Sequence, residues 1–181
     1  MGGLIILLNL YLIIFSFKLL NLDNLIFTGE FLYLVILLST FFYIVGAVDD
    51  IKNLSPRLKL FFIALSFLAV VFFFPDIKLE LIKITFLKKT YHFNNFSVIF
   101  LIFSFLLLSN AMNMFDGINL QLIFFSIFIF VVFIIKSFLP FFFLTLTISL
   151  LILGVLNFKN KVFLGDGGCY LLSSIIGCTF I

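Results

Sequence analysis

The sequence predicts an all-α fold, a polytopic transmembrane helix bundle with about seven spans, and three observations carry this prediction. Hydrophobic residues make up 65% of the 181 residues and charged residues only 10%, whereas a soluble domain carries about 25% charged residues. The apolar residues come in successive runs near the roughly 17–25 residues that a helix needs to cross a bilayer. Short polar segments separate these runs. We expect a single integral-membrane domain over residues 1–181, incomplete at both ends.

Each of the first four apolar runs is interpreted as one span: Leu4–Leu20, Phe31–Val48, Leu60–Phe74 and Phe96–Ser109. The next run, Leu120–Leu156, is too long for one helix, because at 1.5 Å per residue it would extend roughly 55 Å across a hydrocarbon core of about 30 Å. Lys136, Ser137 and Pro140 interrupt it, so we expect two spans joined by a tight turn. A seventh span begins in Gly168–Ile181.

Counting these spans places the acidic junctions on one face of the membrane. Two spans separate Gly3 from Asp49, and two more separate Asp50 from Asp116. Another two lie between Asp116 and Asp166. The 11 Lys and Arg residues divide five to six between the two faces, so the positive-inside rule does not decide which face is cytoplasmic.

The connections between spans are short, with one exception. Ile77–Asn95 is the longest polar connection, and its residues alternate between apolar and polar from Lys78 to Lys83. This alternation predicts a short β-hairpin.

Three acidic sites end or begin these apolar runs: Asp49-Asp50, Asp116-Gly117 and Asp166. Each one alone could be a solvated loop or a turn, since Asp-Gly is a common turn pair. Three on one face are stronger evidence, because carboxylates at the edge of a bilayer usually face a partner or a polar cavity. Clustered carboxylates suit Mg²⁺, which takes one or two of them and completes its shell with water and substrate phosphates.

Polar and small residues beside the aspartates fit a phosphate-bearing substrate. Asn110, Asn113 and Asp116 are spaced three apart, which keeps them on one flank of a helix. The amides could bind a sugar or a phosphate, or cap the helix end. Glycines around Asp166 let the backbone approach a phosphate just before a helix N-terminus, which favours anions.

Four motifs, in order along the chain, resemble those of one enzyme family. Met1-Gly2-Gly3 resembles the end of a Pro-x-Met-Gly-Gly segment, and Asp49-Asp50 resembles an Asp-Asp motif. N-A-M-N-M-F-D-G-I-N at Asn110–Asn119 resembles an Asn-x-x-Asn-x-x-Asp-Gly motif, and F-L-G-D-G-G-C at Phe163–Cys169 resembles a Gly-Asp-x-Gly motif. The family is the polyprenyl-phosphate N-acetylhexosamine-1-phosphate transferases (glycosyltransferase family 4). It includes phospho-N-acetylmuramoyl-pentapeptide transferase and the undecaprenyl-phosphate N-acetylglucosamine-1-phosphate transferases.

This resemblance implies a reaction, a cofactor and a location. A polyprenyl phosphate attacks the β-phosphate of a UDP-N-acetylhexosamine and gives polyprenyl-diphospho-sugar and UMP, with Mg²⁺ required. The active site faces the cytoplasm from the inner (plasma) membrane, and the reaction is the first membrane step of a cell-envelope polysaccharide. The implied partners are the two substrates and the lipid bilayer, with a homodimer as an option and no nucleic acid.

The resemblance also implies residue roles. Asp166 aligns with the Mg²⁺ ligand of the family, while Asp49, Asp50 and Asp116 align with catalytic acidic residues, and a base role is proposed for Asp49. The implied substrate-binding residues are Asn110, Asn113, Asn119 and Lys59. Lys59 could also be a cation that extends from the interface into water, and the same alternative holds for Arg57 and Lys161.

The chain departs from the family pattern in three respects. Asn119 stands where many members have a second Asp, and this variant resembles the branch that primes O-antigen and related surface polysaccharides. The family has about ten or eleven spans, and its late cytoplasmic loop is rich in His and Arg, whereas His92 is the single histidine here and falls in the outer loop. Two alternatives therefore stay open: a catalytically inactive membrane fragment of the family, or an ion or proton transporter. A transporter would carry its acids mid-span rather than at span ends.

Overall fold

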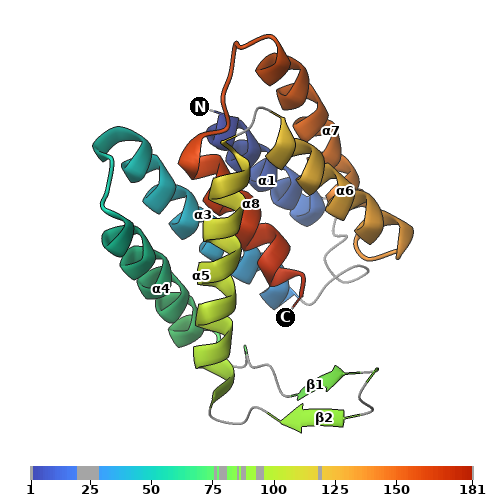
Figure 1. Ribbon diagram of the computed structural model, residues 1–181. Helices are drawn as coiled ribbons and strands as arrows, with labels where there is room; N and C mark the ends of the chain where they lie inside the picture. Colours follow the sequence, from blue (N-terminus) through green and yellow to red (C-terminus); the bar gives the residue numbers. More distant parts are fainter. Residues whose placement is uncertain are drawn as a thin grey trace.

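The computed structural model describes residues 2–19, 29–75, 77, 81–84, 86, 89–92, 96–117 and 120–180. Within these ranges the chain forms seven α-helices and one two-stranded sheet (Figure 1). The helices are α1 (Gly2–Leu19), α3 (Gly29–Lys52), α4 (Pro56–Phe73), α5 (Ser97–Phe115), α6 (Gln121–Ile135), α7 (Pro140–Phe158) and α8 (Gly165–Cys178). The strands are β1 (Leu81–Ile84) and β2 (Lys89–His92). The predicted all-α membrane bundle is confirmed.

Five of the described helices are long and apolar enough to cross a membrane, namely α1, α3, α4, α5 and α7. Helix α6 is a shorter apolar helix, and α8 has only 14 residues. The predicted division of Leu120–Leu156 is also confirmed, because α6 ends at Ile135 and α7 begins at Pro140. Proline suits a first helical position, since its missing N–H would have no partner within the helix there.

The predicted hairpin forms as well. Strands β1 and β2 pair antiparallel, with Leu81 opposite His92 and Ile84 opposite Lys89. Figure 1 places this hairpin at the opposite end of the bundle from the N-terminus. His92 therefore lies far from the helix ends that carry the aspartates.

Helix α8 is the centre of the bundle. Residues 167–178 are all buried, and the helix packs mainly against α3, α5 and α1 (Figure 1). In contrast, the other helices expose large apolar side chains, such as Phe72 and Phe128, as expected for helices that face lipid. The shortest helix is thus enclosed by the longer ones.

Glycines allow the close approach between α8 and its neighbours. A Cβ added at Gly46 would lie 2.5 Å from Cα of Gly167, and one added at Gly3 would lie 2.5 Å from the backbone nitrogen of Gly168. Small residues of this kind let helices in membranes pack backbone to backbone. The start of α1 is also tied to the segment before α8, since Gly2 N–H donates to the carbonyl of Phe163 at 3.0 Å.

The helices extend beyond the apolar runs that predicted them. Helix α3 continues through Asp49-Asp50 to Lys52, and α5 continues through Asn110 and Asn113 to Phe115. The expected polar junction over Asn110–Asn119 is therefore mostly helix within its described part. Polar residues in the last turns of these helices keep helical geometry, because their backbone N–H groups still bond to the preceding turn.

Candidate active site

Asp49 is a buried carboxylate in the last turn of α3. The residue is only 2% exposed. Its Oδ1 accepts the backbone N–H of Leu54 at 2.8 Å, and its Oδ2 forms a salt bridge with the ammonium of Lys59. A buried charge is costly unless it is paired and hydrogen-bonded, so these contacts stabilise the ionised carboxylate at this depth.

Lys59 connects two acidic residues that are distant in the sequence. It lies in the first turn of α4, and its Nζ pairs with Asp49 and donates to Oδ2 of Asp166 at 3.2 Å. The side chain of Lys59 is 24% exposed and that of Asp166 is 27% exposed. The cation therefore joins the ends of α3, α4 and α8 while one side stays open to solvent.

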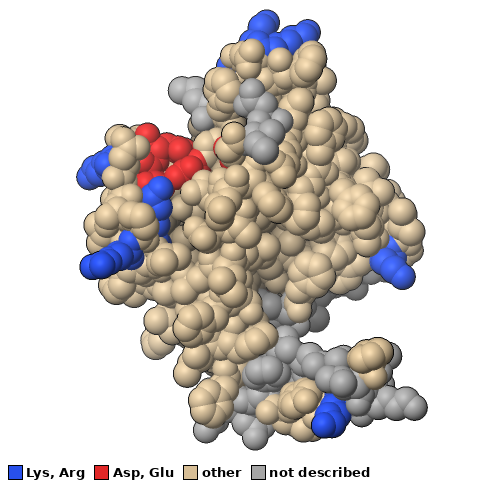
Figure 2. Space-filling view, viewed as in Figure 1, with Lys and Arg blue, Asp and Glu red and all other residues tan. Residues whose placement is uncertain are grey.

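The carboxyl groups of Asp49 and Asp166 are neighbours, since Oδ2 of each contacts the same ammonium of Lys59. A single ammonium does not balance these two carboxylates, and Asp50 next to them adds a third. Figure 2 shows acidic side chains gathered at one place on the surface, next to basic ones. The site therefore carries an excess of negative charge that a cation would offset.

Asp50 is exposed, and its carboxylate lies against the N-terminus of α8. Oδ1 accepts the N–H of Asp166 at 2.8 Å and Oδ2 accepts the N–H of Gly167 at 3.3 Å. Carboxylates are favourable at a helix N-terminus, because its first N–H groups lack partners and the helix dipole is positive there.

Asp116 follows the last turn of α5 and also reaches α8. Its carboxyl group lies near the thiol of Cys169 and the backbone N–H of Gly165, and the Cys169 thiol donates to the carbonyl of Gly165 at 3.1 Å. Burial raises the pKa of Asp116 above its usual value, and the neighbouring charge of Asp50 raises it further, while the nearby thiol and N–H groups act in the opposite direction. Cys169 was not predicted as a site residue, although it lies three residues after Asp166 on the same helix.

The predicted residues thus come together in part. Asp49, Asp50, Asp116, Asp166 and Lys59 meet at the N-terminus of α8. Other predicted or alternative residues do not join this group. Asn110 is exposed and Asn113 is half-buried, and neither hydrogen-bonds to the aspartates within the described residues; Arg57 and Lys161 are exposed, and Asn119 lies outside the described residues.

The acidic cluster has the chemistry of a Mg²⁺ site without being a complete ligand set. Within the described ranges, no three His, Cys, Asp or Glu side chains lie close enough to hold a metal ion by themselves. Mg²⁺ commonly binds one or two carboxylates and keeps water and phosphate oxygens for its remaining positions. The hard oxygens and the excess negative charge at Asp49 and Asp166 fit such an ion.

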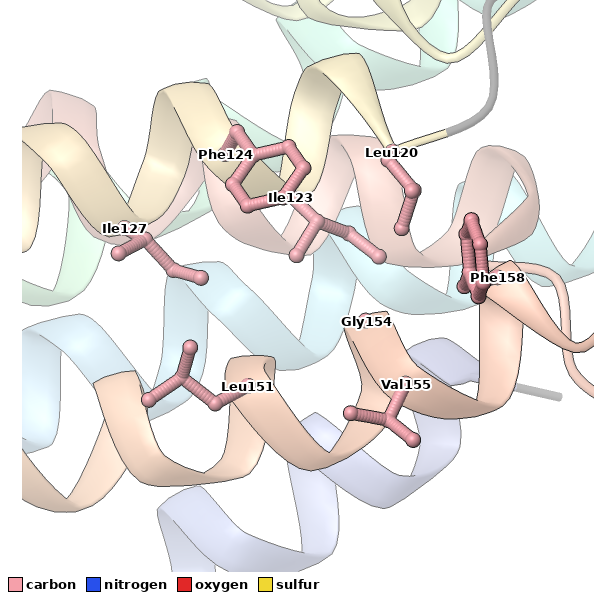
Figure 3. A pocket seen from close by; sticks show the side chains of 8 residues that line it. All are labelled: Leu120, Ile123, Phe124, Ile127, Leu151, Gly154, Val155 and Phe158. Atoms are coloured by element: carbon pink, nitrogen blue, oxygen red, sulfur yellow. The ribbon is translucent and has the colours of Figure 1, made fainter.

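A large cavity described in this structure lies elsewhere, between α6 and α7 (Figure 3). It has a volume of about 440 Å³ and is lined by Leu120, Ile123, Phe124, Ile127, Leu151, Gly154, Val155 and Phe158. Apolar side chains such as Phe124 and Phe158 line it, and both are more than half exposed. Its surface suits hydrocarbon chains of the bilayer rather than a charged substrate.

Comparison with known proteins identifies the family of this chain. A search of curated proteins finds no match. The model of the family described as "Glycosyl transferase family 4" matches residues 32–181. This range includes all but the first three residues of α3, all of α4 to α8, and all four aspartates of the cluster. The chain belongs to glycosyl transferase family 4.

Proposed function

We propose that this protein transfers a sugar-1-phosphate from a UDP-N-acetylhexosamine to a polyprenyl phosphate, such as undecaprenyl phosphate, and releases UMP. The family supports a phosphosugar transferase that acts on a polyprenyl phosphate in a membrane. The observation that carries the finer proposal is the Asp49–Lys59–Asp166 group, in which two carboxylates and one ammonium meet at a helix N-terminus. Such a group suits a metal and a diphosphate together.

The reaction places an acceptor phosphate and a diphosphate next to each other, so charge repulsion is its main obstacle. An oxygen of the polyprenyl phosphate forms a bond to the β-phosphorus of the UDP-sugar. The bond between this phosphorus and the bridging oxygen breaks, and UMP leaves with that oxygen. Catalysis of phosphoryl transfer is mostly positioning and neutralisation of charge.

Asp166 would hold Mg²⁺ in this proposal, with Asp49 beside it. When bound, the ion would neutralise the phosphate oxygens and stabilise the charge that develops on the leaving group. Lys59 would contribute a second positive charge, because its Nζ lies between these two carboxylates on the open side of the site. Substrate phosphates could then draw Lys59 partly away from the carboxylates.

A base role for Asp49 adds little to this mechanism. A phosphate monoester loses its second proton near pH 6, so most of the acceptor is already deprotonated at pH 7. Asp49 also already accepts the N–H of Leu54 and pairs with the ammonium of Lys59. We therefore propose that Asp49 orients Lys59 and helps to balance the charge of the metal ion, rather than removing a proton from the acceptor phosphate.

We further propose that the acidic end of the bundle faces the cytoplasm at the plasma membrane, where UDP-sugars are available, and that the product enters a cell-envelope polysaccharide such as O-antigen. Asn110, Asn113 and Asn119 stay predicted contacts of the nucleotide or sugar. The position of the carboxylates at helix ends, and not at mid-helix, argues against the transporter alternative.

The test is UMP release by the full-length protein in its membranes, supplied with undecaprenyl phosphate and a panel of UDP-N-acetylhexosamines. We expect Mg²⁺-dependent release with one of them, and none from Asp166→Asn, although that variant still inserts into the membrane. Ser66→Ala is the matched control, since this exposed hydroxyl bonds to the carbonyl of Phe62 in its own helix. Absence of release with every sugar would favour the inactive-fragment alternative.

A further inference from the structure

Asp49 and Asp50 are adjacent in the sequence but bind different kinds of groups. Asp49 faces the side chain of Lys59. Asp50 instead directs both carboxylate oxygens at the backbone of α8, to the N–H groups of Asp166 and Gly167. Its contacts are those of an N-cap residue, made from a different helix.

Helix α8 needs such a cap because it has none of its own. Leu164 occupies the N-cap position, and no side-chain cap hydrogen bond is formed there. The first N–H groups of a helix have no intrahelical acceptors, and Gly167, whose N–H is one of them, is buried away from water that could replace an acceptor. A carboxylate is the strongest available acceptor at this positive end of the helix.

Gly165 makes room for the Asp50 carboxylate. Its φ is +72°, a conformation that favours glycine. A Cβ at this position would lie 2.7 Å from Oδ2 of Asp50. The backbone before Asp166 is therefore shaped to receive the carboxylate, which is a second observation independent of the hydrogen bonds.

We propose that Asp50 is a positioning residue that caps α8 from α3 and thereby fixes the carboxylate of Asp166 against Lys59. This replaces the catalytic role that the sequence predicted for Asp50. Each oxygen of Asp50 accepts an N–H from α8, so the start of that helix and the carboxylate fix each other's orientation. The effect of Asp50 on catalysis rests on the proposed function, but its role as the cap of α8 does not.

The cap is tested by backbone hydrogen exchange of the full-length protein in lipid nanodiscs, with Asp50→Asn and Asp50→Ala compared with the unmodified chain. Asp50→Asn keeps one oxygen acceptor for Asp166 N–H but turns an N–H₂ donor toward Gly167. We expect the Gly167 amide to exchange about tenfold faster in Asp50→Asn, and both amides to do so in Asp50→Ala. Unchanged exchange in Asp50→Ala would overturn the cap.

The positioning role is tested by the Mg²⁺ concentration that gives half-maximal UMP release. Because Asn retains the bond to Asp166, we expect Asp50→Asn to keep this concentration within about threefold while losing about tenfold in kcat. Asp50→Ala frees the helix start, so we expect a larger loss of kcat and a higher Mg²⁺ requirement. If Asp50→Asn and Asp50→Ala are equally inactive while exchange in α8 stays normal, Asp50 acts on the chemistry directly and the proposal is wrong.

One control variant and two further outcomes separate the possible failures. Ser104→Ala removes an exposed hydroxyl that bonds to the carbonyl of Phe100 in its own helix, so neither hydrogen exchange in α8 nor UMP release should change. If no variant, including the unmodified chain, releases UMP, the proposed function fails while hydrogen exchange still decides the cap. If Asp50→Ala does not fold, Asp50→Asn alone tests the cap, through the exchange rate of the Gly167 amide.

Discussion

Gly46 of α3 lies directly against Gly167 of α8, and a Cβ at Gly46 would come within 2.5 Å of Cα of Gly167. Contacts this short do not occur between a real Cβ and backbone, so the two helices would have to separate. Asp49 and Asp50 lie on α3 just after Gly46, and Asp166 lies on α8 just before Gly167. The distance between these carboxylates therefore depends on the absence of a methyl group at Gly46.

Gly46→Ala should impair both packing and activity. A shift of about 1 Å at a catalytic site can cost about a hundredfold in rate, and we expect a loss of this order in UMP release together with a lower unfolding temperature. Gly154→Ala is the matched control, because its nearest neighbour, Cγ2 of Ile123, would lie at an ordinary 3.5 Å. A normal rate in Gly46→Ala would show that the close approach of α3 and α8 is not needed.

Lys59→Met should leave Asp49 as a buried carboxylate without its cation. We expect a loss of about 1–3 kcal/mol in the free energy of unfolding, the range for a buried polar group left unsatisfied. Adding Asp49→Asn should restore part of this stability but not the UMP release. Thermal unfolding in detergent measures the first effect, and Lys52→Met, at an exposed cation at the end of α3, serves as the control.

Binding of Mg²⁺ should stabilise the unmodified protein, because a ligand that binds only the folded state raises the unfolding temperature. In Asp166→Asn we expect this increase to disappear, since the proposed ligand has lost its charge. The comparison needs no substrate, so it tests the metal site separately from the transferase reaction. An equal increase in both proteins would remove Asp166 from the metal site.

Cysteine labelling should find the ends of α3 and α7 on the same side of the membrane. We expect Asn53→Cys and Asn160→Cys to react with an impermeant reagent from one side, and Lys136→Cys and Phe86→Cys from the other. All four positions are exposed, and the native Cys169 and Cys178 are buried and should give little background. Opposite accessibility of Asn53→Cys and Asn160→Cys would contradict the arrangement of the helices.

The lengths of the apolar runs predicted the helices well, because run length depends on local composition. The break at Lys136 and Pro140 and the hairpin after Ile77 follow from residues within a few positions. The even number of spans between successive acidic sites then placed the aspartates at one end of the bundle, without any knowledge of packing. The structure meets that prediction, since Asp50 contacts the backbone of Asp166.

The partners within the site could not be predicted in the same way. The glycines around Asp166 were interpreted as room for a phosphate, and that prediction gave no sign that Gly167 packs against α3 or that Gly168 packs against the start of α1. Asp50 and Asp116 look equivalent to Asp49 in the sequence, yet Asp50 binds N–H groups at the start of α8, and Asp116 lies near Gly165 and Cys169 of that helix. These contacts depend on which face each helix turns inward, and uniformly apolar helices carry almost no signal for that choice.

The central position of α8 has a consequence for how the protein is made. This helix is the last of those described, so α1 to α7 enter the bilayer before it during synthesis. Asp49 and Lys59 can meet early, because α3 and α4 are consecutive, but Asp50 has no amides to bind until α8 arrives. Insertion of the first helices and completion of the aspartate cluster are therefore separate steps in the making of this protein.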